Sequence, residues 1–198
     1  MGKLLSSGAE ALIFLENNNV LKSRITKSYR HEIIDVALRK SRTRREIKVI
    51  KSLENYGFVP KLVKNSDYDI EMEYISGDQV KKLLDKNSHL AKIIGKNLTV
   101  MHDLGIIHGD LTTSNMICSG NDCEKLYLID FGLSFFSQKI EDKAVDIHLF
   151  KQALESKHFR VFDEAYRYFI DGYNPKDKRE VLKRLSEVEL RGRNKLKI

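Results

Sequence analysis

The chain contains few of the residues that mark linkers, disulfide scaffolds or membrane spans. Its 198 residues include two prolines, two cysteines and no tryptophan. There is no low-complexity segment or internal repeat, so we do not expect a long flexible linker. No apolar run approaches the roughly 20 residues that cross a bilayer, and the N-terminus lacks the pattern of a secretion signal. These absences predict a compact cytoplasmic protein that does not interact with membranes.

The two cysteines exclude a zinc site of the usual kind. Cys118 and Cys123 are close together in the chain and have no second pair of cysteines to complete four ligands. In a cytoplasmic protein we therefore expect both to be free thiols.

Acidic residues are outnumbered, and the basic excess is clustered. Lys and Arg number 35 against 28 Asp and Glu, which gives a formal charge of +7. Residues 22–48 hold ten basic and only three acidic side chains, and a second basic run covers residues 191–198. Two interpretations remain open from charge alone. The runs are either solvated helix faces with a frayed tail or an electrostatic surface for RNA phosphates, including Arg42, Arg44 and Arg45.

Hydrophobic periodicity and turn residues predict an α+β protein. The first 75 residues should form a small antiparallel sheet with one helix that starts near Thr43 and ends near Gly57. A break at Ser76-Gly77-Asp78 separates this part from a mostly helical second part. We expect one domain with an N-terminal lobe (1–75), a C-terminal lobe (76–190) and a disordered basic tail (191–198). Val145, Phe159, Phe162, Tyr166 and Phe169 are expected in the helical core.

Two short motifs carry the chemistry. Residues 108–115 read His-Gly-Asp-Leu-Thr-Thr-Ser-Asn, and residues 130–132 read Asp-Phe-Gly. Either motif alone is common by chance, but their order and spacing match the base and metal loops of a kinase site. Asp110 is the candidate catalytic base. Asn115 and Asp130 are the candidate ligands for Mg²⁺ that bridges the phosphates of ATP.

An ATP site also needs a cover for the phosphates and a cation to pair with them. Residues 6–11 follow a predicted strand but keep a single glycine of the kinase pattern G-x-G-x-x-G, and a plain turn would look similar. Lys22, on the next strand, is the candidate phosphate lysine. Residues 72–75 lie at the lobe junction, where backbone groups would bind adenine. The full set assigned to nucleotide binding is Ser6, Ser7, Gly8, Ala9, Glu10, Ala11, Lys22, Glu46, Met72, Glu73, Tyr74 and Ile75.

Two acidic residues have structural roles to assign. Glu46 is the best partner for Lys22, although a helix pair with Arg42 would also explain it and Glu32 is an alternative acid. Asp146 either caps its helix or binds the backbone of the loop at His108.

The motifs together resemble a known family. Residues 8–11 (Gly-Ala-Glu-Ala), 42–46 (Arg-Thr-Arg-Arg-Glu), 108–115 and 130–134, with Lys-Ser-Tyr-Arg-His at 27–31 and Arg-Gly-Arg at 191–193, are similar to the small atypical kinases of the KEOPS complex. The resemblance spans almost the whole chain. RIO kinases, which act in ribosome biogenesis, share the His-Gly-Asp loop but match the basic motifs less well.

This resemblance implies a bilobal protein-kinase-like fold, magnesium-dependent use of ATP and atypical Ser/Thr kinase activity. It further implies that the protein acts mainly as an ATPase in threonylcarbamoyladenosine modification of tRNA. The implied partners are the threonylcarbamoyl-transferase subunit and a small regulatory subunit of KEOPS, with the basic tail docking toward the transferase.

The residues themselves favour ATP hydrolysis over protein phosphorylation. Ordinary kinases carry Arg before the catalytic Asp and Lys two residues after it, where this chain has Gly109 and Thr112. Asp146 follows Gly132 by only fourteen positions, which leaves no room for a long activation segment.

Two alternatives belong to other functional classes. The basic runs and the reduced glycine loop would suit a nucleotide- and RNA-binding scaffold with weak catalysis. A small-molecule kinase would also tolerate a His-Gly-Asp loop, but it would need a larger helical lobe.

Overall fold

The computed structural model describes residues 2–8 and 10–194, with the backbone alone for residues 192–194. Ala9, of the predicted phosphate cover, and residues 195–198, of the predicted tail, lie outside the described residues. The chain divides into two compact units. The first comprises residues 1–76 and 127–133, and the second comprises residues 77–126 and 134–198.

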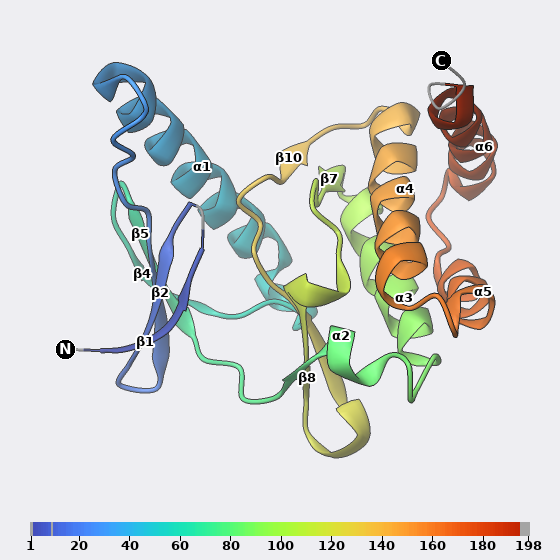
Figure 1. Ribbon diagram of the computed structural model, residues 1–198, viewed down its shortest axis with the longest axis horizontal. Coiled ribbons are helices and arrows are strands. Elements are labelled where there is room, and N and C mark those ends of the chain that lie inside the picture. The colour runs from blue at the N-terminus through green and yellow to red at the C-terminus, as the bar shows by residue number, and fades with distance from the viewer. Residues whose placement is uncertain (1, 9, 195–198) are drawn as a thin grey trace. The chain divides into compact units, whose positions relative to one another are not determined.

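The first unit is built on an antiparallel sheet in the order β1-β2-β3-β5-β4 (Figure 1). Strands β2 and β3 pair as an antiparallel hairpin. Asn17 and Asn18 make its turn with φ values of 47° and 64°, a conformation that asparagine tolerates well. The strands are β1 (Lys3–Ser7), β2 (Leu12–Glu16), β3 (Asn19–Ser23), β4 (Leu62–Asn65) and β5 (Asp69–Glu73).

Helix α1 (Glu32–Leu53) packs against β4 and β5 and is longer than predicted. It begins at Glu32 rather than near Thr43. Its first turns bury Asp35 and expose Ile33, so the apolar spacing that marks a helix in sequence starts only further along. The helix continues into the 3-10 turn η1 (Glu54–Tyr56), and Gly57 ends it with a φ of 74°, as the sequence indicates.

The segment that contains Asp130 belongs to the first unit although it lies far along the chain. Strand β9 (Lys125–Leu128) leads into it, and the amide of Leu128 donates a hydrogen bond of 2.8 Å to the carbonyl of Phe58. Phe131 is fully buried. This anchoring brings residues 130–132 to the sheet and helix of the first unit.

The second unit is mainly helical. Helices α3 and α5 cross so closely that a Cβ on Gly95 would lie 2.3 Å from the carbonyl oxygen of Phe169. A Cβ on Gly172 would lie 2.1 Å from the carbonyl oxygen of Lys92. Its elements are β6 (Asp78–Gln79), α2 (Val80–Leu83), α3 (Leu90–Asp103), β7 (Ile106–Ile107), η2 (Thr113–Asn115), β8 (Met116–Ser119), η3 (Asn121–Cys123), β10 (Phe135–Phe136), α4 (Ile140–Lys157), α5 (Phe162–Gly172) and α6 (Lys178–Asn194).

The expected core and the expected tail of this unit both need correction. Phe159 is 71% exposed and Val145 is 38% exposed, whereas the fully buried Tyr173 was not on the expected core list. Residues 191–194 continue α6 and are not a disordered tail. Among the residues that the structure describes, no helix combines the length and apolar character that a membrane span needs.

The expectation of free thiols is wrong. Cys118 and Cys123 form a disulfide with their Cα atoms 4.8 Å apart. The chain turns sharply enough to bring them together because Gly120, Asp122 and Cys123 all have positive φ, at 82°, 51° and 62°. Sequence spacing alone could not show this geometry, on which disulfide formation depends.

Replacing both cysteines by serine should lower the free energy of unfolding by about 2 kcal/mol, because the bond removes chain entropy from the unfolded state. Urea denaturation of the oxidised protein and the double variant measures this loss, and reductant should bring the two curves together. Two titratable thiols in the denatured, non-reduced protein would contradict the disulfide.

Candidate functional site

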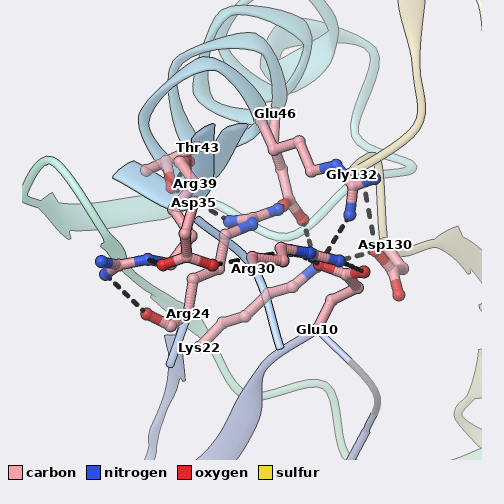
Figure 2. Close-up of polar contacts among 11 residues, drawn as sticks. Glu10, Lys22, Arg24, Arg30, Asp35, Arg39, Thr43, Glu46, Asp130 and Gly132 are labelled. Carbon is pink, nitrogen blue, oxygen red and sulfur yellow. Dashed lines mark hydrogen bonds and ion pairs between the residues drawn. The ribbon is translucent and has the colours of Figure 1, made fainter. Parts of the chain in front are cut away.

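A buried lysine lies at the centre of the first unit between two carboxylates (Figure 2). Lys22, on β3, has its Nζ atom 2.8 Å from Oε1 of Glu46, on α1. The same Nζ atom lies 2.7 Å from Oδ1 of Asp130. The ion pair predicted between Lys22 and Glu46 is therefore present, and the alternative helix pair with Arg42 is not, because Arg42 pairs with Glu10.

The charge of Lys22 is stabilised by these neighbours. Burial by itself would lower the pKa of Lys22, but the carboxylates of Glu46 and Asp130 outweigh it and raise the pKa. The side chain thus remains a fixed ammonium group. It can offer a positive charge to an anion without first taking up a proton.

Asp130 is held in an unusual backbone conformation. Its φ of 63° lies in the left-handed region, which few residues other than glycine adopt. Its Oδ1 atom also accepts a hydrogen bond of 3.3 Å from the amide of Gly132. The side chain is nevertheless half exposed, at 52%. A carboxylate that is fixed in direction but open to solvent is suited to binding a metal ion.

Glu46 has a second cationic partner that sequence reasoning missed. The guanidinium of Arg24 donates to Oε2 of Glu46 at 2.5 Å and to the hydroxyl of Thr43 at 3.2 Å. Arg24 is 3% exposed. In the sequence Arg24 is one member of the basic run at residues 22–48. Its position two residues after Lys22 is the only sign there that it could belong to the site.

The predicted phosphate cover is tied to α1 through Glu10. Arg30 donates to Glu10 at 2.8 Å, and Arg42 lies 2.6 Å from the same carboxylate. The hydrogen bond from Arg30 is the main cause of the lowered pKa of Glu10. The amide of Gly8 donates to the carbonyl of Ala11 at 3.0 Å, and Ser6 and Ser7 end β1. Gly8 is therefore linked to Ala11, which precedes β2, and the side chain of Glu10 is anchored.

The residues expected to bind adenine lie at the end of β5. Met72 is 8% exposed and pairs in register with Val20 and Leu62. The amide of Glu73 donates a hydrogen bond of 2.9 Å to the carbonyl of Lys61. Tyr74 and Ile75 follow the strand. Since the amide of Glu73 is already bonded, the backbone of Tyr74 and Ile75 is better suited to a nucleotide base.

Asp110 and Asn115 lie together in the second unit. The Nδ2 atom of Asn115, at the end of η2, donates to the backbone carbonyl and to Oδ2 of Asp110, each at 2.9 Å. The candidate base and one candidate metal ligand are thus linked directly. The described residues contain no cluster of three or more His, Cys, Asp or Glu side chains that could hold a metal ion by itself. Mg²⁺ commonly uses one or two protein ligands together with phosphate oxygens.

A buried carboxylate fixes the start of this loop. Asp146, inside α4, accepts hydrogen bonds from the amides of His108 and Gly109 at 2.8 and 2.9 Å. Of the two roles considered for Asp146, loop binding is the one observed. His102 lies 3.3 Å from the same carboxylate and 2.7 Å from the hydroxyl of Tyr173. Burial by itself would raise the pKa of Asp146, but the interactions with His102 and His108 outweigh this effect and lower the pKa.

The end of the loop has its own support. The hydroxyl of Thr113 is 2.9 Å from Nε2 of His158, whose Nδ1 atom is 2.6 Å from Asp85. Thr113 and His158 are each 1% exposed. This chain of hydrogen bonds fixes η2, the turn that carries Asn115. Sequence reasoning did not identify it, because its three members come from distant segments.

Comparisons with known proteins fit this geometry. Residues 15–147 match the model of the RIO domain. The chain is 39% identical to the KEOPS complex subunit Bud32 of Pyrococcus abyssi, with 96% of each chain covered. The chain belongs to the RIO-domain family, in the branch of the Bud32 subunits. The predicted family is therefore confirmed.

Two further relatives extend the comparison. The chain is 38% identical to a probable bifunctional tRNA threonylcarbamoyladenosine biosynthesis protein of Methanosarcina acetivorans, covering 97% of this chain but 36% of the longer protein. A Rio2 kinase from Chaetomium thermophilum, solved as an ADP/Mg²⁺-phosphoaspartate complex, matches with a TM-score of 0.62 at 16% identity. The match covers 97% of this chain and 70% of the Rio2 chain. It confirms the predicted protein-kinase-like α+β fold.

Asp146→Asn should lower the free energy of unfolding by about 3 kcal/mol, because the amides of His108 and Gly109 and the ring of His102 lose a charged acceptor. The lowered pKa makes this contribution fully present above pH about 4, and it is lost as the pH falls further. Urea denaturation between pH 3 and 7 should therefore show a steeper acid loss for the wild type than for the variant.

The exposed Asp103, which accepts one bond from the amide of Lys176, provides the control. Asp103→Asn should change stability by no more than about 0.5 kcal/mol. Equal effects of the two substitutions would contradict the structural role of Asp146.

Proposed function

We propose that this protein is a magnesium-dependent ATPase and atypical Ser/Thr kinase that acts within the KEOPS complex in the cytoplasm. Its task there would be to support threonylcarbamoyladenosine modification of tRNA. The observation that carries the enzymatic part is the ammonium group of Lys22 between Glu46 and Asp130. A buried cation beside a half-exposed carboxylate suits a phosphate chain that arrives with its metal ion.

The residues present fit ATP and Mg²⁺. Lys22 would pair with the α and β phosphates, and the turn around Gly8 would cover them. Asn115 and Asp130 would supply oxygen ligands for the metal. When bound, Mg²⁺-ATP supplies the transferable phosphoryl group and neutralises its charge.

Asp110 is the group that would move the proton. The side chain of Asn115 donates to one of its oxygens and leaves the other able to accept from water or a hydroxyl. Gly109 and Thr112 replace the Arg and Lys of ordinary kinases. The Lys that would steady the γ phosphate during transfer to a protein is absent, so water is the favoured acceptor.

The assembly and the RNA substrate are suggested by the names of the relatives. A KEOPS subunit and a tRNA threonylcarbamoyladenosine biosynthesis protein each match nearly the whole chain. We propose the threonylcarbamoyl-transferase and the small regulatory subunit of KEOPS as partners, with residues 191–198 contributing to the first contact. Arg191, at the start of this segment, lies 3.2 Å from Glu141.

The basic residues proposed for tRNA differ in their availability. Arg42 is paired with Glu10 and Arg44 with Asp67. Arg45 is exposed and has no carboxylate partner among the described residues. Arg45 is therefore the member of the three whose charge is most available to an RNA phosphate.

Asp110→Ala and Asp130→Ala should each lower ATP turnover at least about a hundredfold, since each removes the base or a metal ligand. Phosphate release and autophosphorylation, measured with tRNA and the KEOPS partners present, test this. The exposed Asp171 of α5 provides a control, and Asp171→Ala should retain wild-type rates. Wild-type rates in both catalytic variants would refute the assignment, and nucleotide binding without turnover in the wild type would favour a scaffold.

Charge reversal of Arg42, Arg44 and Arg45 to Glu together should weaken tRNA binding at least about tenfold at 0.1 M salt. Arg45→Glu alone should give the largest single effect, because it breaks no ion pair. Filter binding across a salt series would also show a shallower salt dependence in the triple variant. Arg160→Glu, a matched reversal at an exposed site of the second unit, should bind normally. Unchanged tRNA binding by the triple variant would contradict the proposal that α1 carries an RNA-binding surface.

A further inference from the structure

We propose that Arg24 is a positioning residue that holds Glu46 beside Lys22 and keeps α1 docked whether or not nucleotide is bound. This inference rests on the proposed function of the site. It assigns a regulatory consequence to an arginine that has no part in the ordinary lysine–glutamate pair of kinases.

Arg24 and Lys22 share one carboxylate from opposite sides. Oε1 of Glu46 faces Lys22 at 2.8 Å and Oε2 faces Arg24 at 2.5 Å. All three side chains are almost completely buried. Placing a carboxylate out of water is costly unless its charge and both oxygens are compensated. With two cations beside it, the charge of Glu46 stays compensated by Arg24 even if Lys22 turns toward a phosphate.

The guanidinium also connects the end of β3 to an earlier turn of α1. It donates to the hydroxyl of Thr43, which lies on the same face of the helix as Glu46. That hydroxyl in turn donates to the carbonyl of Arg39 at 2.9 Å, and Arg39 donates to the carbonyl of Arg24 at 3.4 Å. Figure 2 shows this ring of contacts around Arg24. The planar fork of the guanidinium lets Arg24 reach Thr43 and Glu46 together.

Arg24 is also next to the segment that carries Asp130. A Cβ placed on Gly132 would lie 3.1 Å from the guanidinium of Arg24 and 3.2 Å from Oδ1 of Asp130. The glycine of the Asp-Phe-Gly motif therefore leaves room for the guanidinium. Arg24 thus borders the helix, the lysine strand and the metal-ligand segment at once.

The consequence concerns how the site is controlled. A lysine–glutamate pair held by one contact opens when its helix swings away. Here, a Lys22 side chain that turns toward phosphates leaves Glu46 still bonded to Arg24, and Thr43 still bonded as well. We therefore expect α1 to stay in place through the nucleotide cycle, and control to come from partners or RNA rather than from helix displacement.

The test is a double-mutant cycle on nucleotide affinity. Arg24→Gln should weaken ATP binding about tenfold, because hydrogen bonds to a charged group contribute on that order. Glu46→Gln should weaken it at least as much. If Arg24 acts through Glu46, the double variant should bind no more weakly than Glu46→Gln alone. Titration calorimetry with ATP and Mg²⁺, together with the KM and kcat of hydrolysis, gives these values, and KM should change more than kcat.

A second readout does not depend on turnover. Amide hydrogen exchange of residues 43–50 should be slow and equal with and without ADP in the wild type, and faster in Arg24→Gln. Arg24→Lys keeps the positive charge but not the planar guanidinium, so it should bind ATP more tightly than Arg24→Gln. If Arg24→Gln does not fold, Arg24→Lys replaces it in the double-mutant cycle. Lys143→Gln controls for general destabilisation, because it removes a buried cation paired with Asp177 in the other unit, and it should leave ATP affinity unchanged.

The outcomes separate this inference from the proposed function. A wild-type protein that does not bind ATP would contradict both the proposed function and the role of Arg24. Weaker binding in Glu46→Gln but not in Arg24→Gln, additive effects in the cycle, or protection of residues 43–50 that appears only with ADP would overturn the role of Arg24 alone.

Discussion

One buried carboxylate organises the first unit. Glu46 compensates two cations that would otherwise be buried without a counter-charge, and these cations come from one end of β3. Removing the carboxylate would leave Lys22 with Asp130 alone and Arg24 with Thr43 alone. Because an uncompensated buried charge costs several kcal/mol, the sheet, the helix and the Asp-Phe-Gly segment depend on this group together. The site is thus part of what holds the unit together.

The second unit follows the same rule with a different carboxylate. Asp146 is fully buried, and its carboxylate oxygens accept hydrogen bonds from two loop amides and contact His102. Its contribution is to fix the start of the loop, while Thr113 and His158 fix the end. Asp110 lies between these two fixed ends and is only partly buried.

The sequence was a good guide to groups that lie close together in the chain. The contact between Asp110 and Asn115 joins residues five positions apart, and the roles predicted for them and for Asp130 follow from the residue types that kinase chemistry requires. The sequence was a poor guide to roles that depend on distant contacts. Arg24 looked like one more member of a basic run, since its burial is created by α1. The disulfide between Cys118 and Cys123 was not predicted because it depends on left-handed backbone conformations between them, which the cysteine residues themselves do not indicate.

The close crossing of α3 and α5 has a consequence for mutational tolerance. Gly95 and Gly172 leave no space for a methyl group, so any other residue must push the two helices apart. Helix α3 carries His102, and Tyr173 follows α5 directly; these two residues support Asp146 from behind. A displacement at the crossing would therefore reach the loop of Asp110 through rigid contacts. Two residues without side chains thus constrain the loop that carries Asp110.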